Sequence, residues 1–78
     1  MQDKLASFIS RTFNAGRPVG LDESLFYSGM IDSFGIQQIA NFITNETGSD
    51  FPATMIVEDD LDTINLLVER GRKLNDLV

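Results

Sequence analysis

Near its centre the chain reads Gly29-Met30-Ile31-Asp32-Ser33-Phe34-Gly35-Ile36-Gln37-Gln38-Ile39. Asp32 and Ser33 are both residue types that favour the position just before the first turn of a helix. Beyond them, apolar side chains recur at three- and four-residue spacing, at Ile36, Ile39, Ala40, Phe42 and Ile43. The stretch therefore predicts an amphipathic helix that opens at Ser33, runs to Thr47 and buries those apolar side chains.

Similar patterns predict helices on either side. Leu5, Phe8, Ile9, Thr12 and Phe13 share one face of a helix from Gln2 to about Asn14. A last helix, capped by Asp62 or Thr63, carries Ile64, Leu67, Val68, Gly71 and Leu74 on one face. Between them, residues 55–61 form either a short third helix or an ordered turn, and the pattern does not separate the two.

The connection over residues 18–32 is long for so small a helical chain, and it is unusually apolar. Its apolar residues are Leu21, Leu25, Phe26, Met30 and Ile31, so we expect it to pack across the core. Gly48 is a natural end for the second helix, and Phe51 is expected to plug the core after it. The fold class expected for residues 1–78 is all-α, a single domain with three long helices, one short helix and a long first loop.

Charge and composition restrict the possible partners. Twelve acidic residues against six basic ones give a net charge of −6, which disfavours nucleic acid and anionic lipid as ligands. The sequence has no cysteine, and it shows neither a secretion leader nor an apolar run long enough to span a bilayer. We therefore expect a cytoplasmic protein that is not associated with a membrane.

Ser33 is a candidate site for covalent modification rather than a catalytic nucleophile. A nucleophilic serine needs a base within hydrogen-bond reach, and the chain contains no histidine. The first turn of a helix carries unpaired N–H groups and the positive end of the helix dipole, which suits a phosphate on this hydroxyl. The other interpretation is that Ser33 only caps the helix.

Residues around Ser33 carry a family resemblance. Leu25-Phe26, Gly29 and Ile31-Asp32-Ser33-Phe34, followed by a helix, resemble the phosphopantetheine attachment motif of acyl, aminoacyl and peptidyl carrier proteins. The resemblance implies that a phosphopantetheinyl transferase moves 4'-phosphopantetheine from coenzyme A onto Ser33 with Mg²⁺, and that Asp32 assists that step. The chain itself would then be no enzyme, but a carrier of an acyl or aminoacyl thioester.

A docking surface is predicted beside the attachment serine. Phe34 lies on the outward stripe of the second helix, where a large aromatic side chain is typical of a contact hot spot. The other residues predicted to contact partners are Met30, Gln38, Asn41, Asn45 and Ile56.

The outward face of this helix is also nearly uncharged. Its residues are Gly35, Gln37, Gln38, Asn41, Thr44 and Asn45, and only Glu46 is charged. Neutrality favours partners that do not rely on a basic patch. Such neutrality is unlike housekeeping carriers of fatty-acid synthesis, whose second helix usually carries many acidic residues. Gly35 after Ser33-Phe34 and the long segment between Pro52 and Asp62 are more similar to discrete monomeric carriers, such as D-alanyl or other aminoacyl carriers, which are loaded by AMP-forming ligases and pass the cargo to acyl-accepting enzymes. The resemblance implies a role in fatty-acid or secondary-metabolite biosynthesis.

Two other classes of function remain open. In a non-covalent helical adaptor, Ser33 would only cap the helix and Phe34 would contribute to a permanent interface. An enzyme would have to use Asp32 or the acids of Asp59-Asp60-Leu61-Asp62. That run lacks the glycine and the distal glutamate of a calcium loop, so we interpret it as a solvated, helix-capping cluster and expect no metal site.

Overall fold

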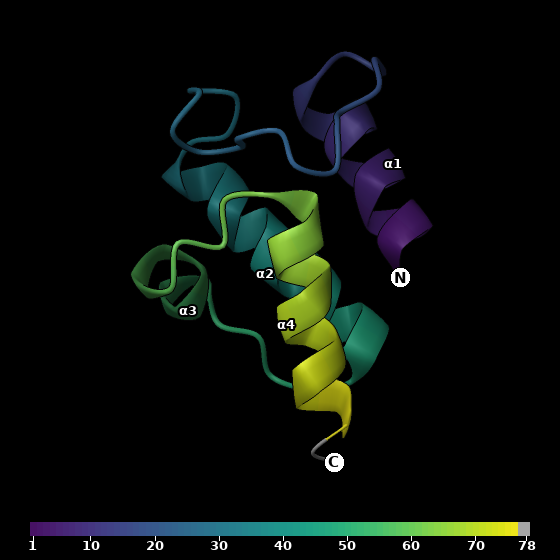
Figure 1. Cartoon of the computed structure of the whole chain (residues 1–78), viewed down its shortest axis with the longest axis vertical. Coiled ribbons are helices and arrows are strands. Elements are labelled where there is room, and N and C mark those ends of the chain that lie inside the picture. The colour runs from purple at the N-terminus through teal and green to yellow at the C-terminus, as the bar shows by residue number, and fades with distance from the viewer. Residues whose placement is uncertain (77–78) are drawn as a thin grey trace.

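The computed structural model describes residues 1–76. Within this range its only regular secondary structure is helical, as the sequence predicted (Figure 1). Its helices are α1 (Gln2–Phe13), α2 (Ser33–Thr47), α3 (Ala53–Glu58) and α4 (Ile64–Asp76). Three of them are long, and α3 has only 6 residues. In Figure 1, α2 and α4 cross at the centre of the molecule, with α1 and α3 on opposite sides of them.

Helix α2 begins and ends where its sequence indicates. Asp32 precedes its first residue, Ser33, and Gly48 follows its last with a left-handed φ of 72°. The Gly48 N–H donates to the Thr44 carbonyl, which satisfies one of the carbonyls left unpaired at a helix end. Both ends of α2 are therefore fixed by local side-chain and backbone chemistry.

The segment that the sequence left undecided forms a short helix. Helix α3 runs over Ala53–Glu58, so it starts two residues before the stretch considered for it, residues 55–61, and ends three residues before that stretch ends. Pro52 stands at its N-cap in an extended conformation, where the missing N–H of proline leaves no intrahelical bond unmade. A turn over residues 59–62 then leads into α4, with Asp60 at a φ of 51°.

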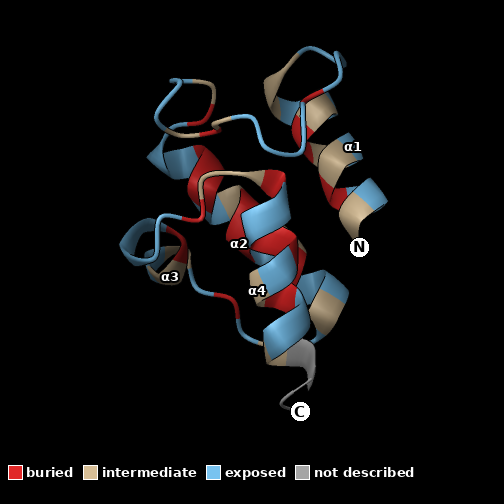
Figure 2. Ribbon diagram, viewed as in Figure 1, coloured by how far each residue is buried: buried red, intermediate tan, exposed pale blue. Residues whose placement is uncertain are grey.

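Apolar side chains from all four helices form one buried cluster (Figure 2). It includes the apolar residues predicted on α2 and α4 with two exceptions, Phe42 and Leu74, which are only half-buried and pack against the cluster. Phe42 stacks on Phe8 at a ring-centroid distance of 4.6 Å. The buried members are Leu5, Ile9, Val19, Leu25, Ile31, Ile36, Ile39, Ala40, Ile43, Phe51, Ile56, Leu61, Ile64, Leu67 and Val68.

The long connection between α1 and α2 contributes to this core. Leu25 and Ile31 are buried, and Phe26 and Met30 pack against the cluster from its edge. Leu21, which was also expected to pack inward, is exposed. The connection is thus anchored at two apolar points shortly before Ser33, and this anchoring places the start of α2 at the edge of the bundle.

Within residues 1–76, no helix has the combination of length and apolar character that a bilayer crossing requires. The longest helix is α2, with 15 residues.

Candidate functional site

Ser33 is the first helical residue of α2, and it is exposed. The residue before it provides the cap: Asp32 is extended, and its Oδ1 accepts the Gly35 N–H at 2.9 Å. A capping role therefore falls to Asp32 and not to Ser33. The Ser33 hydroxyl lies at the positive end of a helix of 15 residues and is accessible from solvent.

Backbone hydrogen bonds close the loop that leads to Ser33 on itself. The Gly29 N–H donates to the Phe26 carbonyl at 3.0 Å, and the Ile31 N–H donates to the Leu25 carbonyl at 3.0 Å. The second bond ends two residues before Ser33. Residues 25–31 therefore form a compact unit whose position determines where Ser33 lies.

Asp62, in the connection between α3 and α4, binds this unit through its side chain. Its Oδ2 accepts the Ser24 hydroxyl at 2.5 Å. Its Oδ1 faces three backbone N–H groups, those of Leu25 at 3.1 Å, Phe26 at 2.6 Å and Tyr27 at 3.3 Å. We call this arrangement the Asp62 clamp. Burial alone would raise the pKa of the Asp62 carboxyl, but the hydrogen bonds from Ser24 and the loop backbone outweigh it, and the pKa is lowered.

No sequence pattern predicted the clamp. Of the two residues predicted to cap the last helix, Asp62 and Thr63, Thr63 does so by accepting the Leu66 N–H on its Oγ1 at 3.1 Å, and the Asp62 side chain binds the loop instead. The donors lie 35 to 38 residues away from Asp62, so no local pattern marks them.

The acids beside Asp62 point to different partners. Asp59 pairs with Arg70 of α4, and Asp60 accepts the Tyr27 hydroxyl at 2.6 Å. The hydrogen bond to Asp60 and the negative charge of that carboxylate raise the pKa of the Tyr27 phenol. These carboxylates therefore diverge, and the described residues contain no group of three or more acid, histidine or cysteine side chains suited to a metal ion.

Most residues predicted to contact partners lie at the surface. Phe34 is 72% exposed, and Asn41 and Asn45 are exposed on the same helix, whereas Gln38 and Met30 are half-buried. The prediction for Ile56 needs correction, because this side chain is 0% exposed and belongs to the core. Its neighbour Val57, which sequence reasoning overlooked, is 58% exposed.

Gly35 also differs from its prediction. It was placed on the outward face of the second helix, but it is buried against α1 and the loop. A Cβ atom at this position would lie 2.6 Å from Ile31 Cγ2 and 2.8 Å from Phe13 Cε1. Glycine thus allows α2 to start in close contact with the residues on which it packs.

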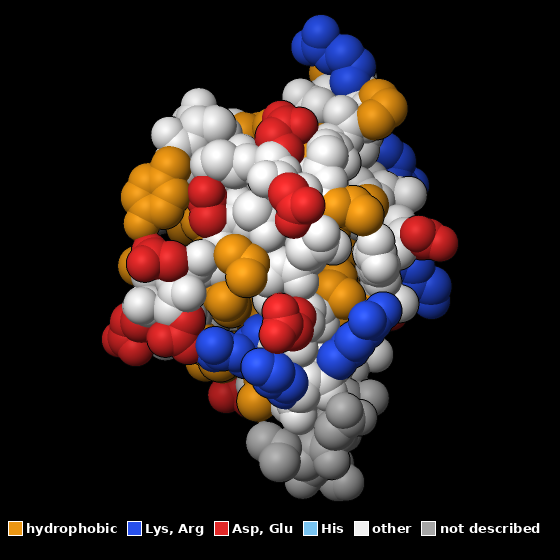
Figure 3. Space-filling view, in the orientation of Figure 1, with side chains coloured by type: hydrophobic (Ala, Val, Ile, Leu, Met, Phe, Trp, Pro, Cys, Tyr) orange, Lys and Arg blue, Asp and Glu red, His pale blue; other side chains and the backbone are white. Residues whose placement is uncertain are grey.

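Charges are separated across the molecule. Residues 18–69 contain ten of the twelve acids and none of the six bases, which all lie in residues 4–17 and 70–73. Figure 3 shows acidic side chains gathered on the left over α3, with basic side chains over α1 on the right and over the lower part of α4. Ser33 therefore lies within a stretch, residues 18–69, that contains no lysine or arginine.

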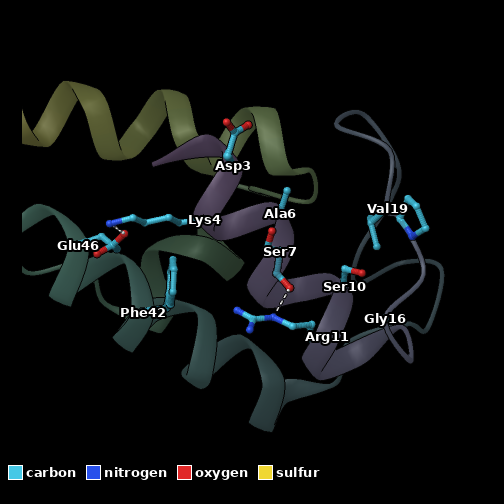
Figure 4. Close-up of a pocket in the computed structure, with 11 residues that line it drawn as sticks. Asp3, Lys4, Ala6, Ser7, Ser10, Arg11, Gly16, Val19, Phe42 and Glu46 are labelled. Carbon is cyan, nitrogen blue, oxygen red and sulfur yellow. Dashed lines mark hydrogen bonds and ion pairs between the residues drawn. The ribbon is translucent and has the colours of Figure 1, made fainter.

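A surface hollow lies away from Ser33. Its lining comes from α1, the following loop and the second half of α2, with Phe42 and Glu46 opposite Lys4 and Arg11 (Figure 4). Lys4 Nζ lies 3.6 Å from Glu46 Oε1 across it. Phe42 follows Ser33 by nine residues, roughly 14 Å along the helix axis, so this hollow is distinct from the serine's surroundings.

Comparison with protein-family models, curated proteins and solved structures gives no match.

Proposed function

We propose that this chain is a carrier protein that holds an acyl or aminoacyl group on a 4'-phosphopantetheine arm attached to Ser33. The observation that carries the proposal is the state of Ser33. It is an exposed serine at the first position of α2, and the capping of that helix is already provided by Asp32. A capping role does not account for Ser33, whereas attachment does.

The surroundings of Ser33 fit a phosphodiester. The hydroxyl has access to solvent, and the first turn of α2 supplies backbone N–H groups and the positive end of the helix dipole. Residues 18–69 contain no lysine or arginine that would clamp the phosphate. We propose that the phosphate is accommodated by the helix end itself.

In the attachment step, the Ser33 oxygen forms a bond to the pantetheine-bearing phosphorus of coenzyme A, and the pyrophosphate bond to the adenosine part breaks. The chain has no histidine, and the neighbouring carboxylate of Asp32 already accepts the Gly35 N–H, so we propose that the base that accepts the Ser33 proton comes from the transferase. Asp32 is engaged with Gly35, which holds Ser33 at a defined place beside the incoming group. When attached, the arm supplies a thiol that carries the cargo as a thioester.

Partner enzymes are proposed to contact Phe34 and the uncharged outward face of α2. The exposed aromatic ring offers apolar contact area, and Asn41 and Asn45 extend the surface without charge. Val57 of α3 replaces Ile56 as the apolar contact on the neighbouring helix. We propose a phosphopantetheinyl transferase, an AMP-forming loading ligase and acyl-accepting enzymes as partners of a monomeric cytoplasmic carrier that is not itself an enzyme and binds no nucleic acid.

The test is intact-mass measurement after incubation with coenzyme A, Mg²⁺ and a phosphopantetheinyl transferase of broad specificity. Wild-type protein is expected to gain the mass of one phosphopantetheinyl group, and Ser33→Ala none. Ser7→Ala, which removes an exposed serine from α1, serves as the control and should be modified like wild type.

Because Asp32 provides the cap, Ser33→Ala should change the free energy of unfolding by less than about 0.5 kcal/mol. Loss of modification in this variant then reflects the missing hydroxyl and not a misfolded domain. A wild-type protein of unchanged mass, or a modified Ser33→Ala protein, would overturn the proposal.

A further inference from the structure

Every side-chain hydrogen bond of Asp62 is made to the loop before α2. Its carboxylate accepts one hydroxyl and three backbone N–H groups, all within residues 24–27. The capping of α4 is left to Thr63. Replacing this carboxylate would therefore act on the loop and leave the α4 cap in place.

The clamp connects to Ser33 through short steps. Asp62 binds the N–H of Leu25, and the carbonyl of Leu25 accepts the N–H of Ile31 at 3.0 Å. Ile31 is buried beside Gly35 in the first turn of α2, and Asp32 caps the same turn. A displacement of the backbone at Leu25 would therefore reach Asp32 and Ser33 through one backbone bond and one packing contact.

Apolar packing alone does not determine the conformation of residues 25–31. Leu25 and Ile31 are buried, but the residues between them are exposed or half-buried. Hydrogen bonds to an ionised acceptor are shorter and stronger than those between neutral groups. The Leu25 N–H also donates to the Asp62 backbone carbonyl at 2.8 Å, and the Tyr27 hydroxyl donates to Asp60, so the loop has other anchors besides its two buried apolar residues. What the Asp62 carboxylate adds is the acceptor for the Ser24 hydroxyl and for the N–H groups of Phe26 and Tyr27.

We propose that Asp62 is a positioning residue for the modification of Ser33: its four hydrogen bonds to residues 24–27 keep the approach to α2 in the one arrangement that a transferase accepts. This inference rests on the proposed attachment function. Without the clamp, only a fraction of the molecules would present Ser33 correctly. The apparent dissociation constant of the transferase for the carrier would then equal the intrinsic constant divided by that fraction, and would therefore rise. Turnover of correctly bound carrier would stay the same.

The experiment compares Asp62→Asn with Asp59→Asn in steady-state modification at saturating coenzyme A, at a temperature where both variants are fully folded. Both changes remove one negative charge from the same turn, but Asp59 pairs with Arg70 and does not touch the loop. We expect Asp62→Asn to raise the KM for the carrier about tenfold with kcat unchanged, and Asp59→Asn to leave both near wild type. Ser24→Ala, which deletes one of the four donors, should raise the KM by a smaller factor.

Amide hydrogen exchange provides the second readout. Exchange at Phe26 and Tyr27 should accelerate in Asp62→Asn, while exchange at Leu25, whose N–H also donates to the Asp62 backbone carbonyl at 2.8 Å, and at Ile39 in the middle of α2 stays near wild type. Faster loop exchange with an unchanged KM would overturn the inference, as would an equal rise of KM in Asp59→Asn. If Asp62→Asn does not fold, Ser24→Ala decides in the same way. Failure of wild-type protein to be modified would contradict the attachment function itself and is distinct from these results.

Discussion

The two buried glycines, Gly35 and Gly71, differ in how much room their surroundings leave for a side chain. A Cβ at Gly35 would meet Ile31 Cγ2 at 2.6 Å and Phe13 Cε1 at 2.8 Å, a branched side chain and an aromatic ring, both packed. A Cβ at Gly71 would meet Met1 Cε at 2.7 Å, the end of a flexible side chain, while Ile43 Cγ2 lies at an ordinary 3.5 Å. The packed neighbours of Gly35 cannot move aside for a methyl group, whereas the flexible end of Met1 beside Gly71 can.

We therefore predict opposite effects of the same substitution. Gly35→Ala should lower the free energy of unfolding by about 1 kcal/mol, because overpacking at roughly 1–3 kcal/mol exceeds the gain in helix propensity. Gly71→Ala should raise it by about 0.5–1 kcal/mol, because Met1 can move aside. Urea unfolding of the two variants measures both. A shift in the same direction for both would contradict the difference in close contacts.

Phe34 provides the second prediction at this scale. With 72% of its surface exposed, its replacement by alanine should change the free energy of unfolding by less than about 0.5 kcal/mol. The rate of modification or loading should fall, because the aromatic contact with the partner is lost. Leu66→Ala, which trims an apolar residue of α4 that is 40% exposed, is the control for both measurements. A large loss of stability in Phe34→Ala would mean that the ring supports the core.

At the scale of the helices, the sequence predicts long elements well and contacts between distant segments poorly. The periodic apolar residues and caps placed α1, α2 and the start of α4 to within a residue or so. Helix α3 has only 6 residues, too few for a period to appear, so Ile56 and Val57 could not be assigned to inner and outer faces. Gly35 was misplaced because glycine has no side chain whose polarity reports burial. The Asp62 clamp joins residues 35 to 38 positions apart, and no local pattern encodes such contacts.

The two faces of α3 can be separated by matched substitutions of neighbours. Ile56→Ala should cost about 2–5 kcal/mol, because it leaves a cavity in the core, whereas Val57→Ala should change stability by less than about 0.5 kcal/mol. Domains of this size have stabilities of roughly 4–12 kcal/mol, so the first loss is a large share of the total. Thermal unfolding compares the two, and similar melting temperatures would refute this orientation of α3.

For the molecule as a whole, ionisation couples the start of α4 to the loop that precedes α2. The pKa of Asp62 is lowered in the folded state below its ordinary value of 3.8. A carboxyl with a lowered pKa contributes stability in full above its unfolded value and loses it as the pH falls through the folded value. The contribution of Asp62 is therefore complete at neutral pH and disappears in acid below about pH 4.

We predict that the difference in stability between wild type and Asp62→Asn is largest near neutral pH and shrinks as the pH is lowered from about 4. Acidification neutralises the other acidic side chains of both proteins to nearly the same degree. The difference between their free energies of unfolding therefore reports the contribution of the Asp62 carboxylate. Urea unfolding at a series of pH values measures it. A difference that stays constant into acid would show that the ionised carboxylate is not what holds the loop.

Tyr27 makes the loop bound by the Asp62 clamp observable by intrinsic fluorescence. It is the only tyrosine of a chain without tryptophan, and its hydroxyl donates to the Asp60 carboxylate at 2.6 Å. A carboxylate acceptor quenches tyrosine fluorescence, so release of this phenol should brighten the emission. An unlabelled sample would thus report opening of the loop beside Ser33 separately from melting of the core, in which every aromatic ring is a phenylalanine.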